Sequence, residues 1–118
     1  MISNVLTCIG DLSDVLMQVV VPIVSWDTCR ESNGIYKREL TDNMICAGYM
    51  EGGKDSCGGD SGGPLVRKRG GSWYQYGVVT WGDGCALPNA PGVYADVVKF
   101  LPWIKEKTGS QYLRMSVS

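Results

Sequence analysis

Two aspartate-serine pairs lie close together in the glycine-rich stretch KDSCGGDSGGP, residues 54–64. A serine becomes a nucleophile where a base takes its proton and where N–H donors hold the oxyanion that forms next. The glycines around Ser61 let the backbone turn so that successive N–H groups converge on one point, which suits an anion-binding nest. No base is evident, because the chain contains no histidine. Taken alone, such a stretch is more often a turn than a catalytic site, so both interpretations stay open.

The bulk composition is that of one globular domain. The chain has 118 residues, 44% hydrophobic and 19% charged, and a chain of that length typically buries about two-thirds of its unfolded surface. Its net charge of −1 offers no overall basic footprint for nucleic acid or for an anionic membrane. Five cysteines indicate disulfides and an oxidising compartment, and the odd number leaves at least one thiol without an internal partner. No cysteine or histidine spacing predicts a metal site.

The beginning of the chain does not resemble a secretory signal peptide, because it has no basic segment and carries Asp11 and Asp14 where an apolar run would stand. The apolar run at residues 15–24 is interrupted by Gln18 and Pro22 and is too short to cross a bilayer. It therefore predicts a buried strand.

Several strands must position the reactive stretch. After the run at 15–24, the polar residues 25–34 predict a loop. Gly70-Gly71 predicts a hairpin turn, and the stretch ending at Gly109 predicts a helix over 99–109, with Pro102 in its first turn. Short strands, glycine-rich connections and one terminal helix favour a mainly antiparallel β-barrel or sandwich. The predicted strands are residues 15–24, 64–69, 72–81 and 93–98.

Longer motifs carry a resemblance to a known family. GDSGGP stands within CAGYMEGGKDSCGGDSGGPLV and is followed by GVVTWGDGCA, PGVYADV and PWI. In this order the motifs resemble the trypsin-like branch of the chymotrypsin-like serine proteases, from about Leu12 to Gly109. The resemblance implies an all-β antiparallel Greek-key barrel, the second of the family's two barrels, with a short C-terminal α-helix. The expected domains are an atypical segment at 1–11, the barrel at 12–110 and a flexible tail at 111–118.

The resemblance assigns roles to the second Asp-Ser pair. Ser61 corresponds to the nucleophile, and the N–H groups of Gly59 and Ser61 correspond to the oxyanion hole. Asp60 corresponds to the acid that orders this loop by a salt bridge to the N-terminus released on activation. No metal and no cofactor are implied.

The first Asp-Ser pair corresponds to the substrate pocket. Asp55 matches the acid at its base, which pairs with a Lys or Arg side chain, and Ser56 could accept a hydrogen bond from a lysine ammonium. Gly82 and Gly92 match the pocket walls, where the lack of a side chain leaves room for a long basic chain. Trp81, with its neighbours, would offer main-chain groups to an extended substrate, although its side chain could equally be plain core.

The same resemblance pairs Cys29 with Cys46 and Cys57 with Cys85, and it leaves Cys8 over. The histidine and aspartate that complete the family's triad lie on its first barrel, which we expect to be absent from this chain. A truncated chain of this kind is expected to be inactive alone. For the complete enzyme the resemblance implies secretion, polypeptide substrates cut after Lys or Arg, and protein inhibitors as possible partners.

Two alternatives remain beside the endopeptidase. One is a non-catalytic binding module that keeps the pocket for a basic side chain without the triad. The other is a structural disulfide-rich domain whose motifs match by accident.

Overall fold

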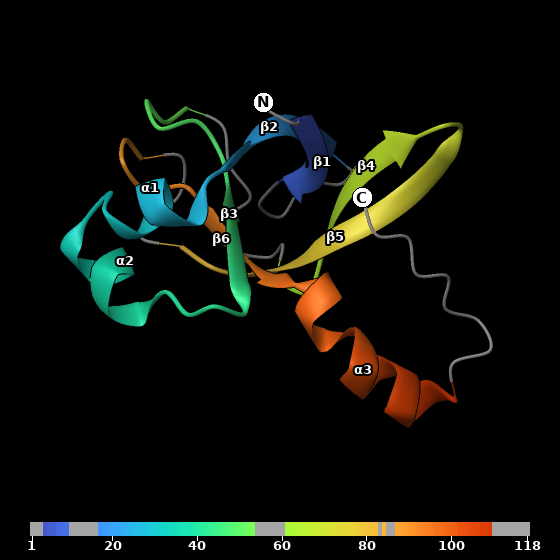
Figure 1. Ribbon diagram of the computed structural model, residues 1–118. Coiled ribbons are helices and arrows are strands. Elements are labelled where there is room, and N and C mark those ends of the chain that lie inside the picture. The colour runs from blue at the N-terminus through green and yellow to red at the C-terminus, as the bar shows by residue number, and fades with distance from the viewer. Residues whose placement is uncertain (1–3, 10–16, 54–60, 83, 85–86, 110–118) are drawn as a thin grey trace.

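The fold is a closed antiparallel barrel with helices at its margins (Figure 1). The computed structural model describes residues 4–9, 17–53, 61–82, 84 and 87–109. Within these residues the strands follow one another around the barrel in the order β1-β2-β3-β6-β5-β4, and each neighbouring pair is antiparallel. The strands are Asn4–Ile9 (β1), Met17–Val24 (β2), Met44–Ala47 (β3), Pro64–Arg69 (β4), Ser72–Trp81 (β5) and Gly92–Asp96 (β6). The all-β barrel expected from the sequence is thus confirmed, and the sandwich is not formed.

The barrel interior is filled by alternate residues of its strands. On β2 the side chains of Val19, Val21 and Ile23 pack inward, whereas Val20 between them is 43% exposed, as the two-residue period of a strand requires. Their partners in the core come from the other strands: Ala47, Leu65, Val79 and Tyr94. This core fixes the register of β2, because a slip by one residue would turn its apolar set outward.

The hairpin of β4 and β5 has the boundaries that the sequence predicts. Gly70 and Gly71 form its turn with φ of 54° and 85°, a left-handed conformation that glycine adopts without steric cost. Two successive positive φ angles match the right-handed twist of the flanking strands. The hairpin projects on the side of the barrel away from the short helices (Figure 1).

Two short helices replace the loop predicted at residues 25–34, so that prediction is wrong. They are Trp26–Arg30 (α1) and Gly34–Glu39 (α2). Ser25 caps α1 by accepting from the Thr28 N–H, and Asn33 caps α2 by accepting from the N–H groups of Ile35 and Tyr36. Such side-chain oxygens satisfy donors that have no partner in the first turn of a helix. A second core cluster lies beneath these helices: Cys29, Tyr36, Leu40, Cys46, Ala90 and Val93.

The C-terminal helix, Val97–Thr108 (α3), begins earlier than expected. Asp96 caps it by accepting from the Val98 N–H, so β6 ends at Asp96 and not at residue 98. Pro102 consequently stands inside the helix and not in its first turn, where its missing N–H deprives the Val98 carbonyl of a helical partner. The predicted stop is confirmed, because Gly109 ends the helix with a φ of 81°.

The first strand extends the barrel toward the N-terminus. β1 pairs with β2 from Asn4 opposite Pro22 to Ile9 opposite Met17, and it also pairs with β4. These residues lie in the segment that the sequence set apart from the barrel at residue 12. In the part of the chain that the structure describes, no helix has the length and apolarity needed to cross a membrane.

Candidate active site

Ser61 lies in a turn that is tied to the end of β5. The Gly62 N–H donates to the Val79 carbonyl and the Val79 N–H donates to the Gly63 carbonyl, both at 2.9 Å. Ser61 itself is exposed. This pair of hydrogen bonds holds the serine just before β4, beside the point where β5 continues into Thr80.

The turn after the serine depends on a glycine for its conformation. Gly62 has a φ of 85°, whereas a Cβ placed on it would meet nothing within 4 Å. The constraint is therefore backbone strain and not lack of space, because residues with a side chain rarely adopt this φ. Gly62 is thus needed for the turn that directly follows Ser61.

The end of β5 forms an open strand edge next to this turn. β5 pairs with β4 only as far as Val78, opposite Pro64, while β6 covers its other edge. A register shift between Val79 and Trp81 leaves Thr80 bulged, and the Thr80 hydroxyl donates to the Val93 carbonyl at 2.9 Å. Among the described residues no strand pairs with β5 beyond Val79 on the β4 side. Bulges of this kind commonly end strand pairing next to a site.

Trp81 packs into the core beneath the short helices. Its ring meets Tyr36 edge-to-face with centroids 5.1 Å apart, and it joins the cluster that contains Val93. Its half-buried side chain therefore packs against the core, and the role of its main chain in substrate binding stays a prediction. Its main chain remains part of the open end of β5.

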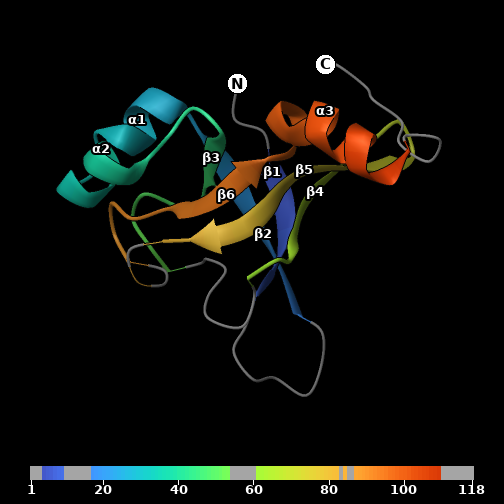
Figure 2. The ribbon, with the colours of Figure 1, turned by 90° about the horizontal axis from the view of Figure 1, so that it is seen from below.

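Gly82 directly follows β5 and Gly92 begins β6, and the end of β5 runs beside the start of β6 (Figure 2). A Cβ on Gly82 would lie 3.8 Å from the Pro91 carbonyl oxygen and 3.7 Å from the Tyr36 hydroxyl. Gly92, directly after Pro91, is buried and pairs with Ala47 of β3. A side chain on Gly82 would thus lie close to Pro91, the neighbour of Gly92, and the family resemblance assigns both glycines to pocket walls.

Tyr36 is the residue that sequence reasoning missed. It is fully buried, and its hydroxyl donates a 2.6 Å hydrogen bond to the Pro91 carbonyl. Because the same ring contacts Trp81, Tyr36 connects α2 to both strands at once. The available signal was Asn33-Gly34, a helix cap directly before an apolar pair, which predicts a helix here but not the contact across the barrel.

The predicted disulfide between Cys29 and Cys46 is present. Their Cα atoms are 6.4 Å apart, and both residues are fully buried. The bond joins α1 to β3 within the core cluster that contains Tyr36. The remaining predicted site residues lie outside the described part of the chain: Asp55, Ser56, Cys57, Gly59, Asp60 and Cys85.

Comparison with known proteins identifies the relatives of this arrangement. The family model described as Trypsin matches residues 5–104. Transmembrane protease serine 5 of Homo sapiens is 53% identical over 94 residues, which are 80% of this chain and 20% of that protein. Trypsin-1 of Astacus astacus is 54% identical over 96 residues, which are 81% of this chain and 40% of that protein. The chain therefore spans less than half the length of these curated relatives.

The match over residues 5–104 covers β1 as well as the barrel strands that follow it, together with the Ser61 turn and the end of β5. Ser61 is exposed, and it lies on a turn that depends on Gly62 beside the open edge of β5. The family model matches nearly all of the barrel that positions this turn. The chain belongs to the trypsin family of serine proteases.

Proposed function

We propose that this chain provides the nucleophile and the substrate pocket of a serine-type endopeptidase that cleaves peptide bonds after Lys or Arg. The observation that carries the proposal is the pair of hydrogen bonds between Val79 and the Gly62-Gly63 turn, which holds Ser61 beside the open end of β5. A substrate added to this edge as an extended strand would present its carbonyl to the serine.

The proposed reaction is acyl transfer. The Ser61 hydroxyl attacks the scissile carbonyl while a base accepts its proton, and the N–H groups of Gly59 and Ser61 hold the oxyanion. The protonated base then gives its proton to the leaving amine, and water releases the acyl group and restores the hydroxyl. The base has to come from outside these residues, because they include no histidine.

Specificity for a basic side chain is assigned to Asp55 at the base of the pocket. Gly82 and Gly92 are proposed as the corresponding walls. A Cβ built on Gly82 would lie 3.8 Å from the carbonyl oxygen of Pro91, the neighbour of Gly92, which supports a short separation between the two walls. A Cβ on either wall would extend toward the path of a long side chain. Ser56 is proposed as a second acceptor, which suits lysine as well as arginine.

The chain alone is proposed to be inactive. Removing the base of a serine protease triad lowers kcat by about a million-fold. Asp60 adds a second requirement, since a carboxylate turned inward without a cationic partner is costly to bury. The loop that forms the oxyanion hole is therefore proposed to stay zymogen-like until an N-terminal amine pairs with Asp60.

We further propose that the complete enzyme acts in the secretory pathway or outside the cell. The Cys29–Cys46 disulfide supports this compartment, because such bonds persist where the surroundings are oxidising. Its partners would be polypeptides with Lys or Arg before the cut bond and protein inhibitors that present the same residues.

The division into segment 1–11, barrel 12–110 and tail 111–118 stays a prediction.

A non-catalytic binding module is the second candidate, and the absence of histidine from the chain is the observation that favours it. Such a module would bind basic side chains through Asp55 without cutting the chain that carries them.

The two candidates are separated by combining the chain with a histidine-bearing first barrel of a trypsin-family relative. The endopeptidase proposal expects cleavage of peptides with Arg before the scissile bond, and no cleavage when Phe replaces Arg. Asp55→Ala should lower kcat/KM on the Arg peptide by at least about 100-fold, since an ionic hydrogen bond contributes about 1.5–3 kcal/mol and its loss leaves a buried charge. Asp42→Ala, a substitution in an exposed turn, is the matched control. Binding of the Arg peptide without cleavage would instead favour the module.

A further inference from the structure

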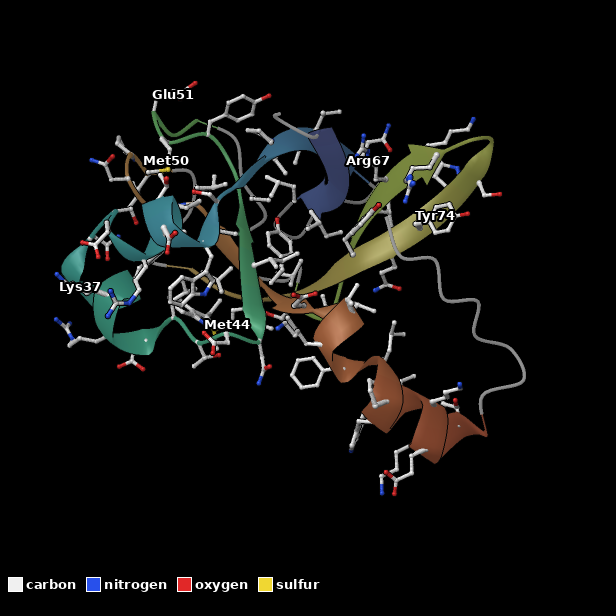
Figure 3. All side chains as sticks on the ribbon, in the orientation of Figure 1. Lys37, Met44, Met50, Glu51, Arg67 and Tyr74 are labelled. Atoms are coloured by element: carbon white, nitrogen blue, oxygen red, sulfur yellow. A yellow bond between two sulfur atoms is a disulfide. The ribbon has the colours of Figure 1, made fainter. Side chains whose placement is uncertain are left out.

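The β4–β5 hairpin concentrates positive charge that the net charge of the chain conceals. Arg67, Lys68 and Arg69 follow one another on β4, and residues 64–82 contain no aspartate or glutamate. Acidic residues are frequent instead in the segment from residue 27 to residue 51. In Figure 3 Arg67 and Tyr74 lie on the hairpin, to the right of Glu51. A local basic surface therefore exists on a chain whose overall charge is −1.

Aromatic rings are interleaved with these cations on both faces of the hairpin. The Lys68 ammonium lies 5.9 Å from the centroid of the Trp73 ring, and the Arg69 guanidinium lies 5.6 Å from that of Tyr74. Lys68 stands opposite Trp73 in the strand register, while Arg67 stands opposite Tyr74. Because neighbouring residues of a strand point to opposite faces, each face carries at least one cation beside one ring.

These side chains are placed for contact with a partner. Trp73 is 56% exposed, and Lys68 and the turn at Gly70 and Gly71 are exposed as well. The ion pairs found among the described residues join Glu31 to Arg30 and Lys37, so Lys68 and Arg69 have no acidic partner within that part of the chain. Tryptophan, tyrosine and arginine, the side-chain types found at positions 73, 74 and 69, are enriched at recognition surfaces.

We propose that the β4–β5 hairpin is a docking surface for a linear sulfated polysaccharide. A sugar ring can stack on the apolar face of Trp73 or Tyr74 while a sulfate on that ring pairs with Lys68 or Arg69. The hairpin presents one cation beside one aromatic ring on each of its two faces. It therefore fits a polymer in which sugar rings and sulfate groups alternate along the chain. The Cys29–Cys46 disulfide points to an oxidising compartment such as the secretory pathway or the cell surface, which suits an extracellular polyanion better than an intracellular nucleic acid.

Binding of a polyanion to this basic surface would be a function separate from peptide cleavage. The hairpin projects from the barrel, whereas the Ser61 turn lies at the other end of β4 and β5 (Figure 1). A polysaccharide bound at the turn of the hairpin would thus leave the open end of β5 accessible and would hold the chain in place through contacts that fall off with salt.

Affinity for immobilised heparin as a function of salt tests this proposal with the full chain. The chain should be retained at physiological ionic strength, and Lys68→Ala combined with Arg69→Ala should weaken binding at least about tenfold with a shallower salt dependence, because fewer counterions are released. Trp73→Ala should weaken binding at all salt concentrations. The matched control is Lys105→Ala combined with Lys107→Ala, which removes the same charge from the exposed end of α3 and should change affinity less than twofold.

Lys68→Arg should keep the affinity, and an unchanged thermal midpoint verifies that each variant is folded. The proposal is overturned if heparin does not retain the chain, or if the α3 variant loses as much affinity as the hairpin variant. It is also overturned if vesicles with anionic headgroups or duplex DNA bind the hairpin more tightly than heparin does.

Discussion

The Tyr36 hydroxyl donates a 2.6 Å hydrogen bond to the Pro91 carbonyl, although the two residues are 55 positions apart in the sequence. The Tyr36 ring also packs edge-to-face on Trp81. One buried side chain of α2 therefore holds the end of β5 and the start of β6 in a fixed relation. Gly82 directly follows β5 and Gly92 begins β6, so the relative position of the two proposed pocket walls would depend on α2.

Replacing Tyr36 by Phe should destabilise the fold. The substitution keeps the ring but leaves the buried Pro91 carbonyl without this donor, at a cost of about 1–3 kcal/mol. Denaturant unfolding of the two chains would measure the difference. Tyr74→Phe is the control, since it removes a hydroxyl from the hairpin surface and should change the free energy of unfolding by less than about 0.5 kcal/mol. Equal losses in both variants would contradict the role given to the Tyr36–Pro91 bond.

Gly77→Ala should also destabilise the barrel, for a steric reason. A Cβ at this position would lie 2.9 Å from the Tyr94 Cβ and 3.2 Å from the Leu65 Cδ2, both on fully buried residues. Overpacking of this kind typically costs about 1–3 kcal/mol. The expected result is a lower midpoint of thermal unfolding, and a variant as stable as the parent would show that β5 and β6 are less closely packed than described.

Gly82→Ala should affect the pocket and not the fold. The added Cβ would approach no described atom closer than 3.5 Å, so the free energy of unfolding should change by less than about 0.5 kcal/mol. In the combined enzyme, kcat/KM on an Arg peptide should fall at least about tenfold, because about 1.4 kcal/mol of lost transition-state binding has that effect. Unchanged cleavage would remove Gly82 from the pocket wall.

The cysteines permit a direct count of disulfides. If Cys57 pairs with Cys85 as Cys29 pairs with Cys46, two disulfides leave one reactive thiol among the five cysteines of the unfolded, unreduced chain. Titration with a thiol reagent should therefore give one equivalent, whereas three would show that the second bond does not form. Replacing Cys29 and Cys46 together by Ser should lower the free energy of unfolding by about 3 kcal/mol in the chain-entropy model.

The parts of the fold that could be predicted are those with a local cause. Gly70 and Gly71 supply the two positive φ angles of a hairpin turn, so β4 ends directly before them at Arg69 and β5 begins directly after them at Ser72. The family motifs predict that Ser61, Gly82 and Gly92 belong to one site, and this assignment stays a prediction. The described geometry places the end of β5 beside the start of β6.

The parts that could not be predicted depend on distant contacts. α1 and α2 have five and six residues, too few to be stable by helix propensity alone. They are held by the Cys29–Cys46 bond and by the contact of Tyr36 with Pro91. The start of α3 was obscured because Val97 and Val98 continue the β-branched pattern of β6, while the Asp96 cap that starts the helix is a single side chain.

The central proposal is that Ser61 acts as a nucleophile once a histidine base and an N-terminal amine for Asp60 are supplied. Labelling by a fluorophosphonate probe, which reacts with activated serines, tests it most directly. We predict that the chain alone is not labelled, that the chain combined with a histidine-bearing first barrel is labelled, and that Ser61→Ala abolishes the labelling. Robust labelling of the isolated chain, or no labelling of the combined enzyme, would contradict the account.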